Sequence, residues 1–76
     1  MVDLVEAIAK SLVDHPEAVE VRKVEGRTAS VIELRVAPED MGKVIGKQGR
    51  IARSIRIVVK AAALKANVKV AVEIVQ

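Results

Sequence analysis

The sequence contains no cysteine and no phenylalanine, tyrosine or tryptophan among its 76 residues. Without cysteine the chain can form neither a disulfide nor a thiolate metal site. No run of 18 or more apolar residues occurs, and the N-terminus lacks the basic and then apolar pattern of a signal peptide. We therefore expect a cytoplasmic protein that does not interact with a membrane.

A folded core is nevertheless expected, because 51% of the residues are hydrophobic. This fraction excludes a disordered chain, and the missing aromatic residues mean that the core is built from Val, Ile, Leu and Ala. We expect residues 1–76 to form a single domain, whose small core supplies roughly a few kcal/mol of net stability. Association with a second copy or with a partner chain would add to that stability.

A helix is predicted at the start of the chain. Asp3 and Glu6 resemble a capping box, in which each side chain satisfies a free amide of the first turn. Apolar residues then recur at helical spacing, namely Leu4, Val5, Ile8, Ala9 and Leu12. The helix should end near Asp14 and His15, because Pro16 disfavours helical backbone in the residue before it.

A β-hairpin is predicted next. Apolar and polar residues alternate from Val19, the pattern breaks at a turn around Gly26, and alternation resumes with Ile32, Leu34 and Val36 on one face. Such a period of two is typical of strands with one buried face.

Two more helices and a closing strand complete the predicted order. A short helix is expected over residues 38–45 and a longer one over 50–66, followed by a strand over 68–74. The predicted buried stripe of the long helix consists of Ile51, Ile55, Val58, Val59, Ala62 and Ala66. The predicted basic cluster on its opposite side consists of Arg53, Arg56 and Lys60. The fold class is therefore α+β, a two-layer sandwich in which the three helices cover one face of a three-stranded sheet.

Charge is distributed unevenly along the chain. Residues 1–40 carry five basic and nine acidic side chains, whereas residues 41–76 carry eight basic and one acidic. Between Lys43 and Lys60 there are six basic residues and no acidic residue. Such a patch attracts an anionic partner, of which nucleic acid is the first candidate, although a solvated helix face is the simpler alternative.

The stretch Val44–Arg50 lies between the two predicted helices and carries the most specific pattern. Gly46 and Gly49 flank Lys47 and Gln48, so the backbone can turn sharply and a nucleic-acid backbone can approach closely. The following helix offers free amides and a partial positive charge to phosphate. An ordinary helix-to-helix turn is the alternative interpretation of these glycines.

This stretch and the element order resemble the KH domain, whose GXXG loop holds about four nucleotides of single-stranded RNA. The resemblance covers essentially the whole chain, and the order matches the type II arrangement of small stand-alone bacterial KH proteins of the KhpA type. It implies a clamp made of Gly46, Lys47, Gln48 and Gly49, flanked by Lys43, Arg50 and Arg53. It also implies an apolar floor or its support from Ile45, Ile32 and Leu34. Ala52 departs from the family pattern, where a larger aliphatic residue is common.

Enzymatic alternatives fit poorly. Gly42, Gly46 and Lys47 superficially look like a phosphate loop, but only three residues separate the glycines and Gln48 replaces the required Ser or Thr. His15 has no nucleophile beside it, and the acidic residues are dispersed rather than clustered as metal ligands. We therefore expect no enzyme activity, no metal and no cofactor. RNA modules that stack bases on aromatic side chains are also excluded.

A second surface is predicted on the long helix. Ile57, Ala61 and Leu64, bordered by Val58, lie away from the predicted core stripe and form a possible dimer seam. Scattered exposed aliphatic residues are the simpler interpretation.

Two functional hypotheses follow. The first is a sequence-tolerant binder of single-stranded RNA with a role in RNA-level regulation, for example as an RNA chaperone. The second is an assembly module that forms a homodimer, or a heterodimer with another KH-containing protein, with RNA contact secondary.

Overall fold

A three-stranded mixed sheet organises the computed structural model, which describes residues 1–75. Its helices and strands are α1 (Val2–Leu12), β1 (Glu20–Glu25), β2 (Ser30–Arg35), α2 (Met41–Ile45), α3 (Arg50–Lys65) and β3 (Val70–Val75). Short 3-10 turns lie at Pro16–Ala18 (η1), Pro38–Asp40 (η2) and Lys47–Gly49 (η3). The predicted α+β fold and its element order are confirmed, and both agree with a type II KH arrangement.

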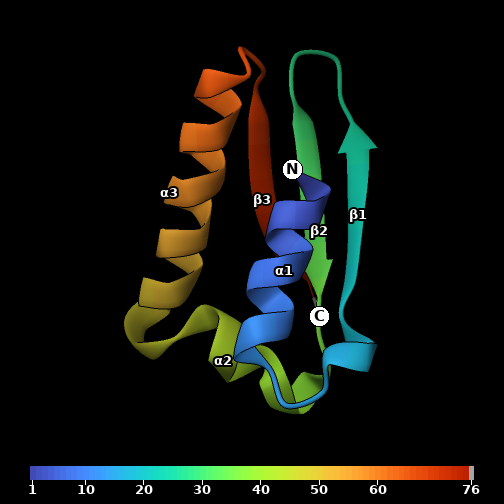
Figure 1. Ribbon diagram of the computed structural model, residues 1–76, viewed down its shortest axis with the longest axis vertical. Helices are drawn as coiled ribbons and strands as arrows, with labels where there is room; N and C mark the ends of the chain where they lie inside the picture. Colours follow the sequence, from blue (N-terminus) through green and yellow to red (C-terminus); the bar gives the residue numbers. More distant parts are fainter. Residues whose placement is uncertain (76) are drawn as a thin grey trace.

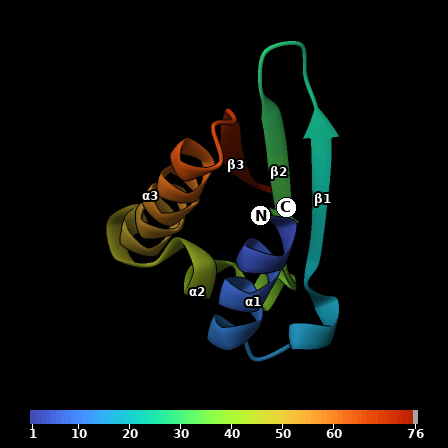
Figure 2. The same cartoon turned by 45° about the horizontal axis from the view of Figure 1, so that its top comes forward.

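Strand β2 is central, with β1 antiparallel to it on one side and β3 parallel to it on the other. The hairpin register pairs Glu25 with Ser30, across a turn of residues 26–29. A parallel pair needs a crossover connection, and α2 and α3 supply it between β2 and β3. The helices cover one face of the sheet, and α3 runs alongside β3 (Figures 1 and 2).

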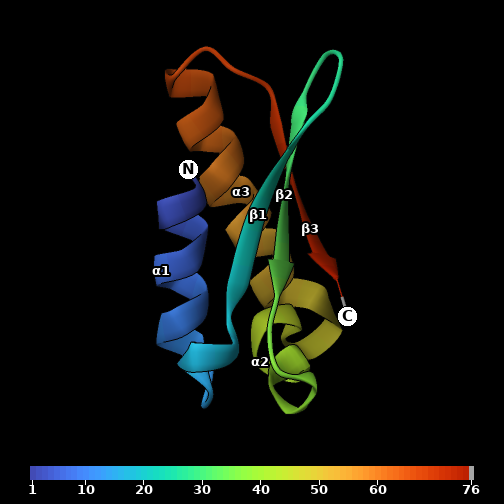
Figure 3. The ribbon, with the colours of Figure 1, turned by 90° about the vertical axis from the view of Figure 1, so that its right-hand side faces the viewer.

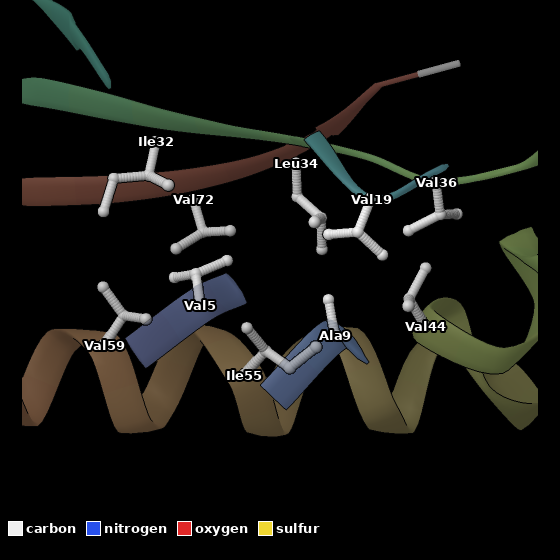
Figure 4. Close-up of a cluster of buried hydrophobic side chains, with 10 residues drawn as sticks. All are labelled: Val5, Ala9, Val19, Ile32, Leu34, Val36, Val44, Ile55, Val59 and Val72. Carbon is white, nitrogen blue, oxygen red and sulfur yellow. The ribbon is translucent and has the colours of Figure 1, made fainter. Parts of the chain in front are cut away.

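The core lies between the sheet and the helices and is entirely aliphatic. Figure 4 shows its ten buried side chains, which are Val5, Ala9, Val19, Ile32, Leu34, Val36, Val44, Ile55, Val59 and Val72. Burial of a Val, Leu or Ile side chain contributes about 1.5–3 kcal/mol. The core therefore holds α1, α3 and the sheet together without any aromatic residue.

The predicted buried stripe of α3 is partly wrong. The buried residues of this helix are Ala52, Ile55, Val59 and Ala63. Val58 is 44% exposed, and Ala66 follows the end of the helix and is exposed. The helix is rotated so that two alanines face the rest of the protein, and their small side chains allow α3 to pack closely.

Several predicted boundaries also need correction. The helix expected over residues 38–45 begins with the 3-10 turn η2, so that α2 itself starts at Met41, and α1 ends at Leu12 rather than near Asp14. Helix α1 begins at Val2, and no side chain caps its N-terminus, so the predicted Asp3 and Glu6 capping box is wrong. Strand β1 begins one residue after Val19, which is buried beside η1. Strand β3 begins two residues after Val68, which is 48% exposed.

A buried carboxylate joins the end of α1 to the start of α2. Asp40 is 1% exposed, and its two oxygens accept the backbone N–H groups of Asp14, at 3.2 Å, and His15, at 2.9 Å. Two hydrogen bonds to a charged acceptor satisfy a group whose burial would otherwise be costly. Asp40 thus fixes where α2, and the loop that follows it, lie relative to α1.

We predict that Asp40→Ala lowers the free energy of unfolding by about 1.5–3 kcal/mol, because the bonds to a charged acceptor are lost. Urea denaturation measures this loss. Asp40→Asn is the matched control: it keeps one carbonyl acceptor, so the loss should be smaller. A change below about 0.5 kcal/mol, the size typical of a surface substitution, in Asp40→Ala would contradict the role assigned to this carboxylate.

Candidate nucleic-acid interface

The Gly46–Gly49 loop makes a sharp turn that depends on three residues with positive φ. Gly46 has φ 77° and ψ 174°, Gln48 has φ 57°, and Gly49 has φ 75°. The Gly46 N–H donates to the Gly42 carbonyl at 2.9 Å, and the Gly49 N–H donates to the Gly46 carbonyl at 3.2 Å. These bonds close the turn from inside and leave its outer side free.

The two glycines are required for different reasons. A Cβ atom at Gly46 would lie 2.5 Å from Cγ1 of Ile51, so this position has no room for a side chain. A Cβ atom at Gly49 would meet no atom within 4 Å, so only its left-handed backbone favours glycine. Space around Gly49 is therefore open to a ligand.

The middle of the loop presents hydrogen-bond donors to solvent. The side chains of Lys47 and Gln48 are exposed, and their backbone N–H groups have no acceptor within the described chain. The first turn of α3 follows immediately and adds the positive end of a helix dipole. These groups together can hold an anion at the surface.

Exposed cations continue from the loop along α3. Arg50 and Arg53 are exposed, and within residues 1–75 neither lies within ion-pair distance of a carboxylate. Arg56 turns toward β3, where its Nε donates a long 3.4 Å hydrogen bond to the Val72 carbonyl. All three members of the predicted basic cluster are exposed, and two of them, Arg56 and Lys60, lie on the side of the helix that faces β3.

Lys43 differs from the other predicted cations because the fold gives it a partner. Its Nζ lies 2.9 Å from Oδ2 of Asp14, which comes from the end of α1. The hydrogen bond and the charge of Lys43 lower the pKa of Asp14 below 3.8, and Asp14 in turn raises the pKa of Lys43 above 10.5. The pair thus stays charged at neutral pH and weakens only as the pH falls through the Asp14 pKa or rises through that of Lys43.

A groove runs between α3 and β3, and no sequence pattern predicted it. Its volume is about 620 Å³, and α3 contributes Arg56, Lys60, Ala63 and Leu64 to its wall. Residues 68–72 form the opposite wall, next to the open edge of β3. That edge is open because β3 is the outer strand of the order β1-β2-β3, and a single strand pattern does not reveal this position.

The predicted apolar floor divides into two parts. Ile32 and Leu34 are 1% and 0% exposed and belong to the core, so they can only support the site from beneath. Ile45, at the end of α2, is 37% exposed and lies next to the loop. Ala52 is buried in the packing of α3 rather than at the surface.

The KH-domain model described as KhpA/KhpB, KH domain, matches residues 2–74. The chain belongs to this family. Membership agrees with the type II order of the elements and with the position of the GXXG loop between α2 and α3.

Similar proteins cover the same length. RNA-binding protein KhpA of Clostridium perfringens is 67% identical over 75 residues, which span 99% of this chain and 100% of the relative. RNA-binding protein KhpA of Caldanaerobacter subterraneus is 64% identical with the same coverage. That of Aquifex aeolicus is 50% identical over 97% of this chain and 94% of the relative. No solved structure gives a significant match.

These relatives are named for RNA binding and not for a reaction. Membership of their family confirms the expectation that the chain is not an enzyme. Within residues 1–75 no three His, Asp or Glu side chains cluster as a metal site would require. No helix of the described chain is long and apolar enough to cross a membrane.

The predicted dimer seam lies on the outer side of α3 of this KH domain. Ile57 is 61% exposed, Val58 44% and Leu64 71%, and Ala61 is also exposed. Leu64 also lines the groove, so the seam and the groove meet at this residue.

We predict that Gly46→Ala destabilises the KH domain more than Gly49→Ala does. Each substitution places a side chain on left-handed backbone, at a cost of about 1–3 kcal/mol, but only the Gly46 variant also overlaps Ile51. Thermal and urea denaturation of the two variants measure the difference. Equal stabilities would show that the Ile51 contact does not restrict Gly46.

Proposed function

We propose that the chain is a single KH domain that binds single-stranded RNA in the cytoplasm, with low sequence specificity and a role in RNA-level regulation. The observation that carries the proposal is the Gly46–Gly49 loop at the surface. It brings together two amides and several cations that have no partner among the described residues, at the start of α3. The names of the relatives support RNA as the ligand.

The loop would hold the sugar-phosphate chain. The N–H groups of Lys47 and Gln48 can donate to phosphate oxygens, and the Lys47 ammonium adds a full charge beside them. Arg50 and Arg53 extend the positive surface along the first turns of α3. Backbone contacts of this kind position a nucleic acid without reading its sequence.

The groove between α3 and β3 would hold the bases. Its walls include the apolar side chains of Ala63, Val68, Val70 and Val72, flanked by Arg56 and Lys60. The open backbone edge of β3 offers N–H and C=O groups to base edges. No aromatic side chain is present for stacking, so base preference would rest on shape and on few hydrogen bonds.

We predict that Lys47→Asp with Gln48→Asp weakens binding of a short single-stranded RNA at least tenfold. The change replaces one cation by two carboxylates at the clamp. The loss of one phosphate contact should reduce the magnitude of the slope of log K against log salt concentration by about 0.7. Fluorescence anisotropy at several salt concentrations measures both quantities.

The matched control for this experiment is Lys10→Asp with Ser11→Asp, which makes the same change of charge on the exposed surface of α1. It should bind nearly as the original chain does. Circular dichroism checks that each variant is folded. A folded clamp variant that binds RNA like its control would refute the proposed clamp.

A second candidate function is assembly through the seam on α3. Ile57 and Leu64 are the two most exposed large hydrophobic side chains of the described chain, and they lie on the same outer side of one helix with Ala61 between them. A second copy or another KH-containing protein could bury them. The family description, which names both KhpA and KhpB, supports a partner of the same domain type.

We predict that Ala61→Asp gives a monomer, because it places a charge in the middle of this apolar seam. Light scattering after gel filtration measures the mass, which should fall from twice the 8.2 kDa of one chain to the mass of one chain. Ala7→Asp, on an exposed position of α1, is the control and should leave the mass unchanged. An unchanged mass for Ala61→Asp would place any interface elsewhere.

A further inference from the structure

Two turns meet at the end of the molecule opposite the Gly46–Gly49 loop. One is the β1–β2 turn of residues 26–29, and the other joins α3 to β3 over residues 66–69. The Ser30 N–H donates to the Lys69 carbonyl at 3.0 Å and ties the two turns together. Figures 1 and 3 show both turns projecting beyond the N-terminus of α1.

The turns border a second hollow of about 500 Å³ with a mixed lining, in which Gly26, Ala29, Leu64 and Val68 lie beside polar residues suited to an anion. The polar side chains that line it are Arg27, Thr28, Ser30, Asn67 and Lys69. They comprise two cations, two hydroxyls and an amide, and no carboxylate is among the lining residues. Phosphate oxygens accept hydrogen bonds from all of these groups.

The two cations in this hollow, and two of its backbone amides, are not used by the protein itself. Within residues 1–75 neither Arg27 nor Lys69 forms an ion pair, and the N–H groups of Arg27 and Thr28 have no acceptor. The nearest carboxylate along the hairpin, Glu25, lies 3.5 Å from Lys23 and is engaged there. The hollow therefore presents positive charge without a counter-charge.

The hollow continues the groove between α3 and β3. Leu64, Val68 and Lys69 line both spaces. Helix α3 runs from the clamp at Arg50 to the hollow at Leu64, a distance of about 21 Å at 1.5 Å per residue. A nucleic-acid strand that leaves the clamp along the groove thus reaches the two turns.

We propose that the hollow between the β1–β2 turn and the α3–β3 turn is a second phosphate-binding site for the same RNA strand. Arg27 and Lys69 hold backbone phosphates there, so the footprint exceeds the roughly four nucleotides that a GXXG loop holds alone. This proposal rests on the proposed RNA-binding function. It predicts that a longer RNA binds more tightly, and that Arg27 and Lys69, which lie far from the clamp, are responsible for the difference.

The test compares a four-nucleotide and a ten-nucleotide RNA by fluorescence anisotropy at several salt concentrations. The variant is Arg27→Ala with Lys69→Ala, and the matched control is Lys10→Ala with Arg35→Ala, which removes the same two types of cation elsewhere on the surface. For the ten-nucleotide RNA, the loss of two phosphate contacts should reduce the magnitude of the slope of log K against log salt concentration by about 1.4. This corresponds to about 25-fold weaker binding at 0.1 M salt. For the four-nucleotide RNA we expect no change.

The clamp variant Lys47→Asp with Gln48→Asp separates this proposal from the one on which it rests. If the clamp variant loses binding while Arg27→Ala with Lys69→Ala binds the ten-nucleotide RNA like the control, the second site is refuted and the proposed function stands. If the clamp variant binds both RNAs like the original chain, both proposals are overturned. Selective loss for the longer RNA supports the second site.

Discussion

The buried carboxylate of Asp40 is the interaction on which the geometry of the binding surface depends. It accepts two backbone N–H groups from the segment that ends α1, while its own backbone leads directly into α2 and the GXXG loop. The core positions α1 and α3 against the sheet, but α2 has only five residues and buries only Val44. A helix this short gains little stability by itself. The charged hydrogen bonds of Asp40 therefore compensate for the small apolar surface of α2.

Steric fit in the loop and charge around it serve separate purposes. Gly46 lies against Ile51 and closes the turn toward the protein, whereas Gly49 is open on the side where a ligand would approach. The fold also decides which cations are free: Asp14 forms an ion pair with Lys43, whereas the cations from Lys47 onward form no ion pair within residues 1–75. The strongest positive surface is consequently displaced from α2 toward α3 and its groove.

Local patterns were sufficient to predict the element order, because Pro16, Pro38 and Gly46 interrupt clear helical and alternating segments. They predicted correctly that Ile57 and Leu64 lie away from the core, but not which other residues of α3 are buried. Val58 and Ala66 are at least as apolar as Ala52 and Ala63, and only packing against the rest of the protein selects the latter two. The Lys43 and Asp14 pair joins residues 29 positions apart, and no local pattern encodes it. The groove depends on the place of β3 as the outer strand of the sheet, which its own residues do not reveal. Sequence therefore predicts the loop that we propose as the clamp, whereas the groove that we propose for the bases depends on tertiary structure.

The sheet has two open edges, and their side chains differ. Strand β1 carries Glu20, Arg22, Lys23 and Glu25, and charges on an edge strand discourage pairing with a second sheet. Strand β3 carries Glu73 as its one charged residue and is otherwise Val, Ala and Ile. A ligand lying against β3 would shield the edge that is least protected from intermolecular β-pairing. Occupancy of the groove should therefore also keep concentrated protein from aggregating.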